Sequence, residues 1–167
     1  MKVIIHDLTP AAFASLGIAQ NEECAVVSDD GSIRHCIGCF GCWIKTPGKC
    51  VLKDGYANMG QLLSRCDELV IISRCTYGSY SPFVRNVLDR CIPYILPYFM
   101  RINGETHHQR RYDNAYRMTV HFYGEDITDS ERETARALTQ ANGVNFHATS
   151  VMAFFHKDIT RLGEASA

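Results

Sequence analysis

Residues 68–90 read ELVIISRCTYGSYSPFVRNVLDR and join a strand to a helix. The unbroken apolar run at residues 69–72 predicts a strand that is buried on both faces, as in a parallel sheet. Ser81 and Pro82 predict the start of a helix, because a serine hydroxyl caps the first turn and proline suits the first helical position. This stretch therefore predicts one β-loop-α unit of an α/β fold.

The same alternation of strand and helix continues on both sides of this unit. Further strands are predicted at Lys2–His6, Cys24–Val27, Met118–Tyr123 and Val151–Phe155. Further helices are predicted after Thr9 and Pro10, over residues 59–66, and from Thr128 with Glu131 as a capping box to a stop near Gly143. Five strands alternating with helices favour a doubly wound sheet, and the chain length suits a flavodoxin-like three-layer sandwich with a five-stranded parallel sheet in the order 2-1-3-4-5. We expect one domain over residues 1–167, because there is no repeat or linker.

Composition excludes several classes of function. A hydrophobic fraction of 46%, a charged fraction of 21% and a net charge of −1 are ordinary for a folded domain and give no field that would attract nucleic acid. No stretch approaches the roughly 20 apolar residues that span a bilayer, and no segment is typical of a signal peptide. We therefore expect a cytoplasmic protein with no nucleic-acid partner and no membrane partner.

Four of the eight cysteines lie within residues 36–50, which we call the cysteine segment: Cys36, Cys39, Cys42 and Cys50. Their C-x2-C-x2-C-x7-C spacing, with three glycines between them, suits an Fe4S4 cluster, and tetrahedral zinc would also fit. The alternatives are reduced thiols without a ligand, or a redox pair formed by Cys36 and Cys39. The other four are predicted to be core residues: Cys24, Cys66, Cys75 and Cys91.

Motifs after this segment carry a family resemblance. Residues 50–59 read CVLKDGYANM, residues 76–80 read TYGSY, and Asp89 and Arg90 follow. With these motifs the chain resembles the iron–sulfur flavoprotein branch of the flavodoxin-like NADPH-dependent FMN reductase superfamily. Residues 97–112 resemble the insertion that related proteins carry before the fourth strand, so an insertion is expected at about residues 92–115.

The resemblance implies a function and a site. The function is an FMN-dependent oxidoreductase or electron-transfer flavoprotein that takes electrons from NAD(P)H, has an Fe4S4 cluster on the four cysteines and forms a homodimer or homotetramer. Strand ends and resemblance together give the following cofactor-binding residues: Thr9, Thr76, Tyr77, Gly78, Ser79, Tyr80, Ser81 and Gly124. Catalytic residues stay unassigned, because flavin chemistry needs no protein nucleophile. We expect the loop at residues 76–81 and the cysteine segment to share one rim.

The first loop departs from the family pattern. Residues 6–12 read HDLTPAA, whereas the family has a Gly-Ser-rich turn around the flavin phosphate. The Asp7 carboxylate has the same sign of charge as the flavin phosphate, and Pro10 removes one amide donor. The alternative is therefore a flavodoxin-like module that has lost FMN binding and acts as a zinc-binding or partner-binding protein. A third hypothesis is a thiol oxidoreductase. His107 and His108 are expected at an oligomer contact or at the flavin edge.

Overall fold

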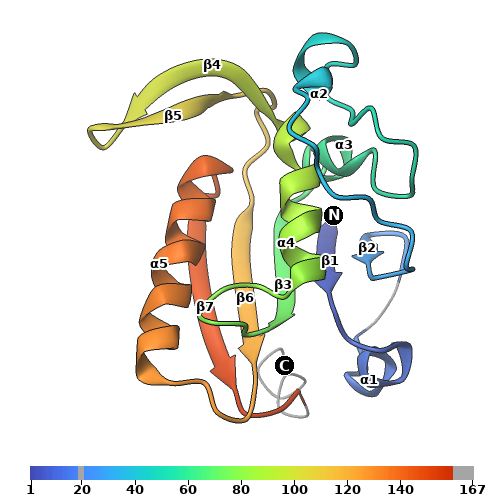
Figure 1. The fold of residues 1–167 in the computed structure, drawn as a ribbon, viewed down its shortest axis with the longest axis vertical. Helices are drawn as coiled ribbons and strands as arrows, with labels where there is room; N and C mark the ends of the chain where they lie inside the picture. The colour runs from blue at the N-terminus through green and yellow to red at the C-terminus, as the bar shows by residue number, and fades with distance from the viewer. Residues whose placement is uncertain (19–20, 160–167) are drawn as a thin grey trace.

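The structure is a computed structural model that describes residues 1–18 and 21–159. A parallel sheet of five strands runs through its centre in the order β2-β1-β3-β6-β7 (Figure 1). Its strands are β1 (Lys2–His6), β2 (Cys24–Val27), β3 (Glu68–Arg74), β6 (Arg117–Tyr123) and β7 (Ser150–His156). Counted within this sheet, the order is 2-1-3-4-5, which confirms the predicted flavodoxin-like α/β fold class.

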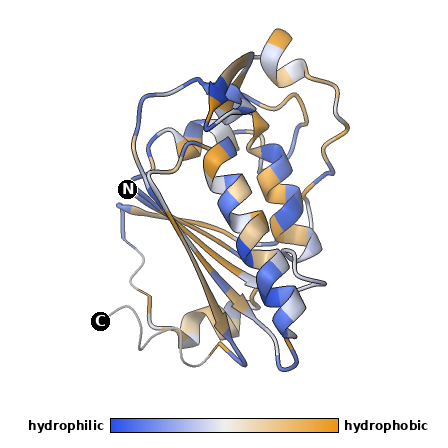
Figure 2. Cartoon of the chain, turned by 90° about the vertical axis from the view of Figure 1, so that its left-hand side faces the viewer, coloured by the Kyte–Doolittle hydropathy of each residue, from blue (hydrophilic) through white to orange (hydrophobic). Residues whose placement is uncertain are grey.

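Helices cover the two faces of the sheet unequally. They are α1 (Pro10–Ser15), α2 (Gly41–Ile44), α3 (Met59–Leu63), α4 (Pro82–Arg90) and α5 (Asp129–Asn145), with a 3-10 turn η1 at Ile92–Tyr94. The helices α4 and α5 lie on one face, and the short α1 lies on the other (Figure 2). None of the described helices combines the length and apolar character needed to cross a membrane.

Local capping signals explain where the main helices begin. The Thr9 hydroxyl accepts a hydrogen bond from the amide of Ala12, and the Ser81 hydroxyl accepts one from Val84. Thr128 forms the predicted capping box with Glu131 at the start of α5. Each cap satisfies an amide that has no partner within the helix, so these three predictions are confirmed.

Alternating residues of β1 show how the core is divided. Val3 and Ile5 pack into the larger core beneath α3, α4 and α5, whereas Ile4 packs with Phe13 and Leu16 on the α1 side. Burial of each such side chain contributes about 1.5–3 kcal/mol relative to exposure. The α4/α5 face therefore supplies most of the apolar stabilisation.

A β-hairpin projects from the domain between α4 and β6. Its antiparallel strands are β4 (Ile95–Ile102) and β5 (Glu105–Arg110), and it reaches over one end of α5 (Figure 1). Asn103 and Gly104 form the turn with positive φ angles of 51° and 87°, which is the conformation of a two-residue hairpin loop. The hairpin lies within the stretch that was expected to be an insertion.

Candidate functional site

A cleft of about 660 Å³ opens at the carboxyl ends of the parallel strands. It receives residues from the ends of β3 and β6, from the loops after β1, β3, β6 and β7, and from α1 and the start of α5: Asp7, Leu8, Thr9, Ala12, Arg74, Cys75, Tyr123, Gly124, Glu125, Asp126, Ile127, Glu131, Lys157, Asp158 and Ile159. The carboxyl ends of β1, β3, β6 and β7 therefore meet around one crevice, which is where parallel α/β sheets bind ligands. Its volume lies within the usual range for a small-molecule site.

Asp7 joins three strand ends at this cleft. One carboxylate oxygen accepts a hydrogen bond from the backbone amide of Arg74 at 2.9 Å, and the other accepts one from the Tyr123 hydroxyl at 3.0 Å. Burial raises the pKa of Tyr123, and the nearby Asp7 carboxylate raises it further. The phenol is therefore a neutral donor that is already committed to Asp7.

Several backbone amides of the first loop already donate hydrogen bonds within the domain. The Asp7 amide donates to the carbonyl of Ile72, and the Leu8 amide donates to the Nδ1 atom of His6. Burial lowers the pKa of His6, which keeps the ring neutral and its Nδ1 atom able to accept this bond. Pro10 has no amide hydrogen, and the Ala12 amide donates to the Thr9 hydroxyl.

The charge of the cleft is predominantly negative. Its lining contains five carboxylates and two basic side chains: Asp7, Glu125, Asp126, Glu131 and Asp158, with Arg74 and Lys157. A phosphate group would meet this negative surface and a first loop in which the amides of Asp7, Leu8 and Ala12 are already bonded within the domain. The first loop and its surroundings therefore do not fit the phosphate of FMN.

A flavin ring system fits the cleft better than a phosphate does. Leu8, Ile127 and Ile159 supply apolar surface, and Gly124 carries no side chain that would keep a planar ring away. Thr9 and Gly124, two of the predicted cofactor-binding residues, both line the cleft. The arrangement can enclose an uncharged ring with polar groups at its edge.

The predicted third-strand loop, Thr76–Ser81, lies outside the residues that line this cleft. Thr76 and Ser79 exchange backbone hydrogen bonds of 2.9 and 3.0 Å across a tight turn. Tyr77 and Gly78 form the turn with φ angles of 52° and 73°, and the Tyr77 side chain is 90% exposed. A Cβ atom on Gly78 would lie only 2.7 Å from Cβ of Thr134, so the loop packs closely on α5.

The last two residues of this loop have structural partners. Tyr80 is buried, stacks on Phe122 at 5.4 Å between ring centroids and accepts a hydrogen bond from Asn142 at 3.3 Å. Ser81 caps α4, and its amide donates to the hydroxyl of Ser73 at 2.8 Å. These contacts hold the start of α4 against the sheet.

The cysteine segment lies at the other end of the molecule. Figure 1 shows α2 beyond the amino ends of the strands, whereas the loop between β3 and α4 lies toward their carboxyl ends. The Trp43 indole fixes this position by donating to the carbonyl of Ile95 at 2.9 Å. The expectation of a shared rim is therefore wrong.

The four sulfurs do not form a ligand set in this arrangement. Within residues 1–18 and 21–159, no group of three or more His, Cys, Asp or Glu side chains is close enough to hold a metal ion. Cys36 and Cys39 are exposed. Burial raises the pKa of the Cys42 thiol, and Cys50 raises it further. The cysteine segment as folded here does not fit an Fe4S4 cluster or tetrahedral zinc.

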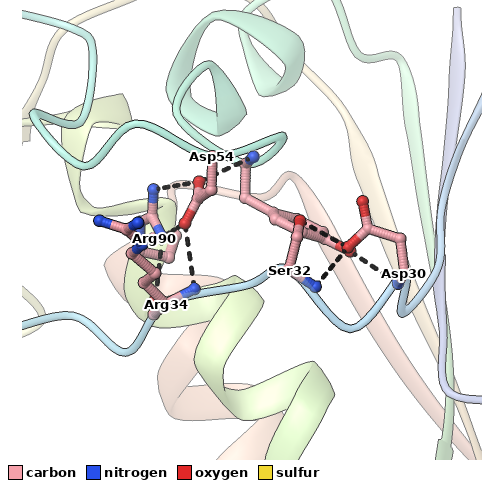
Figure 3. A network of polar contacts seen from close by, with 6 residues as sticks. Asp30, Ser32, Arg34, Asp54 and Arg90 are labelled. Carbon is pink, nitrogen blue, oxygen red and sulfur yellow. Dashed lines mark hydrogen bonds and ion pairs between the residues drawn. The ribbon is translucent and has the colours of Figure 1, made fainter.

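A buried ion pair anchors the chain on either side of the cysteine segment (Figure 3). The guanidinium of Arg90 donates two hydrogen bonds to Asp54, at 2.7 and 2.8 Å, and one to the carbonyl of Arg34 at 2.8 Å. Asp54 also accepts bonds from the amides of Arg34 and Tyr56. The Arg90 hydrogen bonds are the main cause that lowers the pKa of Asp54 to about 2. Both side chains are essentially inaccessible, at 0% and 2% exposed.

The two adjacent histidines of the hairpin have different surroundings. His107 contacts Asn145 and Glu105, whereas the His108 ring lies between Trp43 and Phe99. Figure 1 shows the hairpin beyond the amino ends of the strands, whereas the cleft lies at their carboxyl ends, so the expected contact with the flavin edge is wrong for the cleft of the same chain. A role in oligomer contact stays a prediction.

Comparison with known proteins supports the fold. No family model matches the sequence, and no curated protein matches it. General stress protein 14 of Treponema denticola, solved in complex with FMN, is 14% identical over 98% of this chain and 94% of its own, with a TM-score of 0.57. An FMN-dependent NADH-azoreductase of Bacillus anthracis, also solved with FMN, is 10% identical over 98% and 92%, with a TM-score of 0.56. Azoreductase AzrA is 11% identical over 99% and 91%, with a TM-score of 0.55. At these identities the likeness establishes the flavodoxin-like fold.

Proposed function

We propose that the chain is a flavin-dependent oxidoreductase of the FMN reductase type. The cleft at the carboxyl ends of the strands carries this proposal, because flavodoxin-like sheets bind their ligands at that place. Two structures that share the fold were solved with FMN. A flavin in the cleft would supply a group that accepts hydride from NADH or NADPH.

The residues of the cleft would position such a ring and exclude water. Leu8 and Ile159 would cover it with apolar surface, and Gly124 would let it approach the end of β6. The Asp7 carboxylate would hold Tyr123 in place rather than take part in the reaction. No protein nucleophile is needed for this chemistry.

A flavin-dependent NAD(P)H oxidation assay tests the proposal. The purified chain, supplied with flavin under anaerobic conditions, is expected to bleach NADH or NADPH absorbance at a rate proportional to protein. Gly124→Val should lower this rate strongly, because the valine side chain would fill the space at the end of β6 that the ring would use, and its Cβ would lie 3.2 Å from Ile127. Gly55→Ala is the control, since its Cβ would meet its nearest neighbour, Asp30, at an ordinary 3.6 Å. Equal rates from both variants would contradict the assigned site.

A second candidate is the flavodoxin-like module that has lost FMN binding and binds zinc or a partner through the cysteine segment. The specific observation in its favour is the first loop, where the Asp7 carboxylate already accepts hydrogen bonds from the Arg74 amide and the Tyr123 hydroxyl. The visible spectrum of anaerobically purified protein separates the candidates. Flavin bands support the oxidoreductase, a broad brown shoulder supports an Fe4S4 cluster on rearranged cysteines, and a colourless protein that contains zinc supports the module.

A further inference from the structure

We infer that the cleft takes a flavin without a phosphate group, riboflavin, in preference to FMN. This inference rests on the proposed function and names its ligand class. Riboflavin and FMN have the same ring and the same ribityl chain, so the phosphate alone distinguishes them. The hydrogen bonds and charges of the residues around the first loop therefore determine whether the phosphate favours or opposes binding.

The Asp7 carboxylate already takes up two hydrogen-bond donors at the cleft. The Asp7 side chain spans the ends of β1, β3 and β6, where it accepts hydrogen bonds from the Arg74 amide and the Tyr123 hydroxyl. An incoming phosphate would have to displace Asp7 from both donors or remain without them. Displacing Asp7 would leave its half-buried carboxylate without these partners, and a phosphate that did not displace it would go without these two donors; both outcomes are unfavourable.

The first loop offers little to compensate for that loss. The amides of Asp7 and Leu8 are bonded within the domain, and Pro10 has none. The helix that follows has only six residues, so it gives a weak dipole and few aligned amides. The first loop therefore keeps few of its amides for an anion.

The charge of the cleft also disfavours binding of the FMN phosphate. A phosphate monoester carries about −1.5 to −2 charge near neutral pH. In the cleft it would meet five carboxylates and only two basic side chains, Arg74 and Lys157. One unpaired like-charge contact near a protein surface changes a binding constant by about tenfold or more. Riboflavin is uncharged and escapes this repulsion.

Paired flavin titrations of the full chain test the inference. Quenching of flavin fluorescence is expected to show riboflavin binding at least about tenfold more tightly than FMN at low salt. Added salt should strengthen FMN binding and leave riboflavin binding unchanged, because salt screens repulsion. Asp7→Ser should narrow the difference in affinity between riboflavin and FMN. Glu133→Gln, on the exposed side of α5 outside the cleft lining, should leave that difference unchanged.

A second variant keeps the test decisive if Asp7→Ser does not fold. The double variant Glu125→Gln/Asp126→Asn leaves the Asp7 hydrogen bonds intact and removes two negative charges from the cleft. It should also raise the affinity for FMN relative to riboflavin.

The outcomes separate the inference from the proposed function. FMN binding as tightly as riboflavin would overturn the inference and leave a flavin-dependent function standing. Binding of neither flavin would overturn both. A preference for riboflavin that responds neither to salt nor to loss of the cleft carboxylates would show that charge is not its cause, and would also overturn the inference.

Discussion

Replacing Asp54 by asparagine leaves the buried guanidinium of Arg90 without its counter-charge. The Arg90 side chain is 0% exposed, so water cannot take the place of the carboxylate. Removing one partner of such a pair costs about 3–5 kcal/mol of the free energy of unfolding. For a domain of this length, that loss lowers the melting temperature by roughly 2–4 °C per kcal/mol.

The same pair predicts how stability depends on pH. The pKa of Asp54 falls from an ordinary 3.8 to about 2 in the folded chain. At about 1.4 kcal/mol per pH unit, this difference contributes roughly 2.5 kcal/mol. Because the folded pKa is the lower one, the contribution is complete above about pH 4 and is lost as the pH falls toward 2. Asp54→Asn should lack this component.

Urea unfolding followed by fluorescence provides the assay, since Trp43 is the one tryptophan of the chain. Asp30→Asn is the control, because Asp30 is an exposed carboxylate that accepts bonds from Ser32 and the Tyr56 hydroxyl and pairs with no buried cation, so it should change stability much less. The double variant Asp54→Asn/Arg90→Leu should recover much of the loss, because it removes the uncompensated charge. A loss below about 1 kcal/mol for Asp54→Asn, with an unchanged acid slope, would refute the reasoning.

Three further predictions follow from other parts of the structure. Gly78→Ala should lower the free energy of unfolding by about 1–3 kcal/mol in thermal melts, because its Cβ would lie 2.7 Å from Thr134 at a φ of +73°. Burial, with a smaller effect of His156, lowers the pKa of His121 to about 4, so stability should fall as the pH drops from 6.5 toward 4. His121→Phe should flatten that slope in a series of unfolding curves, and an equally steep slope would count against it. Cys91 is fully buried, so mass spectrometry should find it alkylated only when the chain unfolds, while the exposed thiols of the cysteine segment react at once.

Structural features that depend only on residues close together in the sequence were predicted well. The strand at residues 69–72 and the caps at Ser81 and Thr128 need only a few adjacent residues to form. The predicted helix stop near Gly143 differs slightly from the structure, where α5 continues to Asn145. Gly143 is required by packing, because a Cβ there would lie 2.2 Å from a methyl group of Val151.

The β-hairpin carried a local signal that sequence reasoning missed. Asn103 and Gly104 are a favoured pair for a two-residue hairpin turn, and both adopt positive φ angles in the structure. The resemblance predicted an insertion at this place but no strands. The Asn-Gly pair would have identified the turn without any knowledge of the fold.

The position of the cysteine segment depended on distant contacts. A connection between parallel strands leaves the carboxyl end of one and returns to the amino end of the next, so residues 28–67 must pass from one end of the sheet to the other. Cysteine spacing does not say how far along that path the segment lies. The contacts of Trp43 with Ile95 and of Arg90 with Asp54 hold it at the far end. Neither pairing can be inferred from local sequence.

The order of the strands also bears on how the chain is assembled during synthesis. Once β3 has been made, β1 has both of its neighbours, β2 and β3. Each later strand of the sheet then joins the edge left by the preceding one, β6 on β3 and β7 on β6. The ribosome therefore delivers the strands in an order that lets the sheet grow outward, and no late strand has to be inserted between two that are already paired.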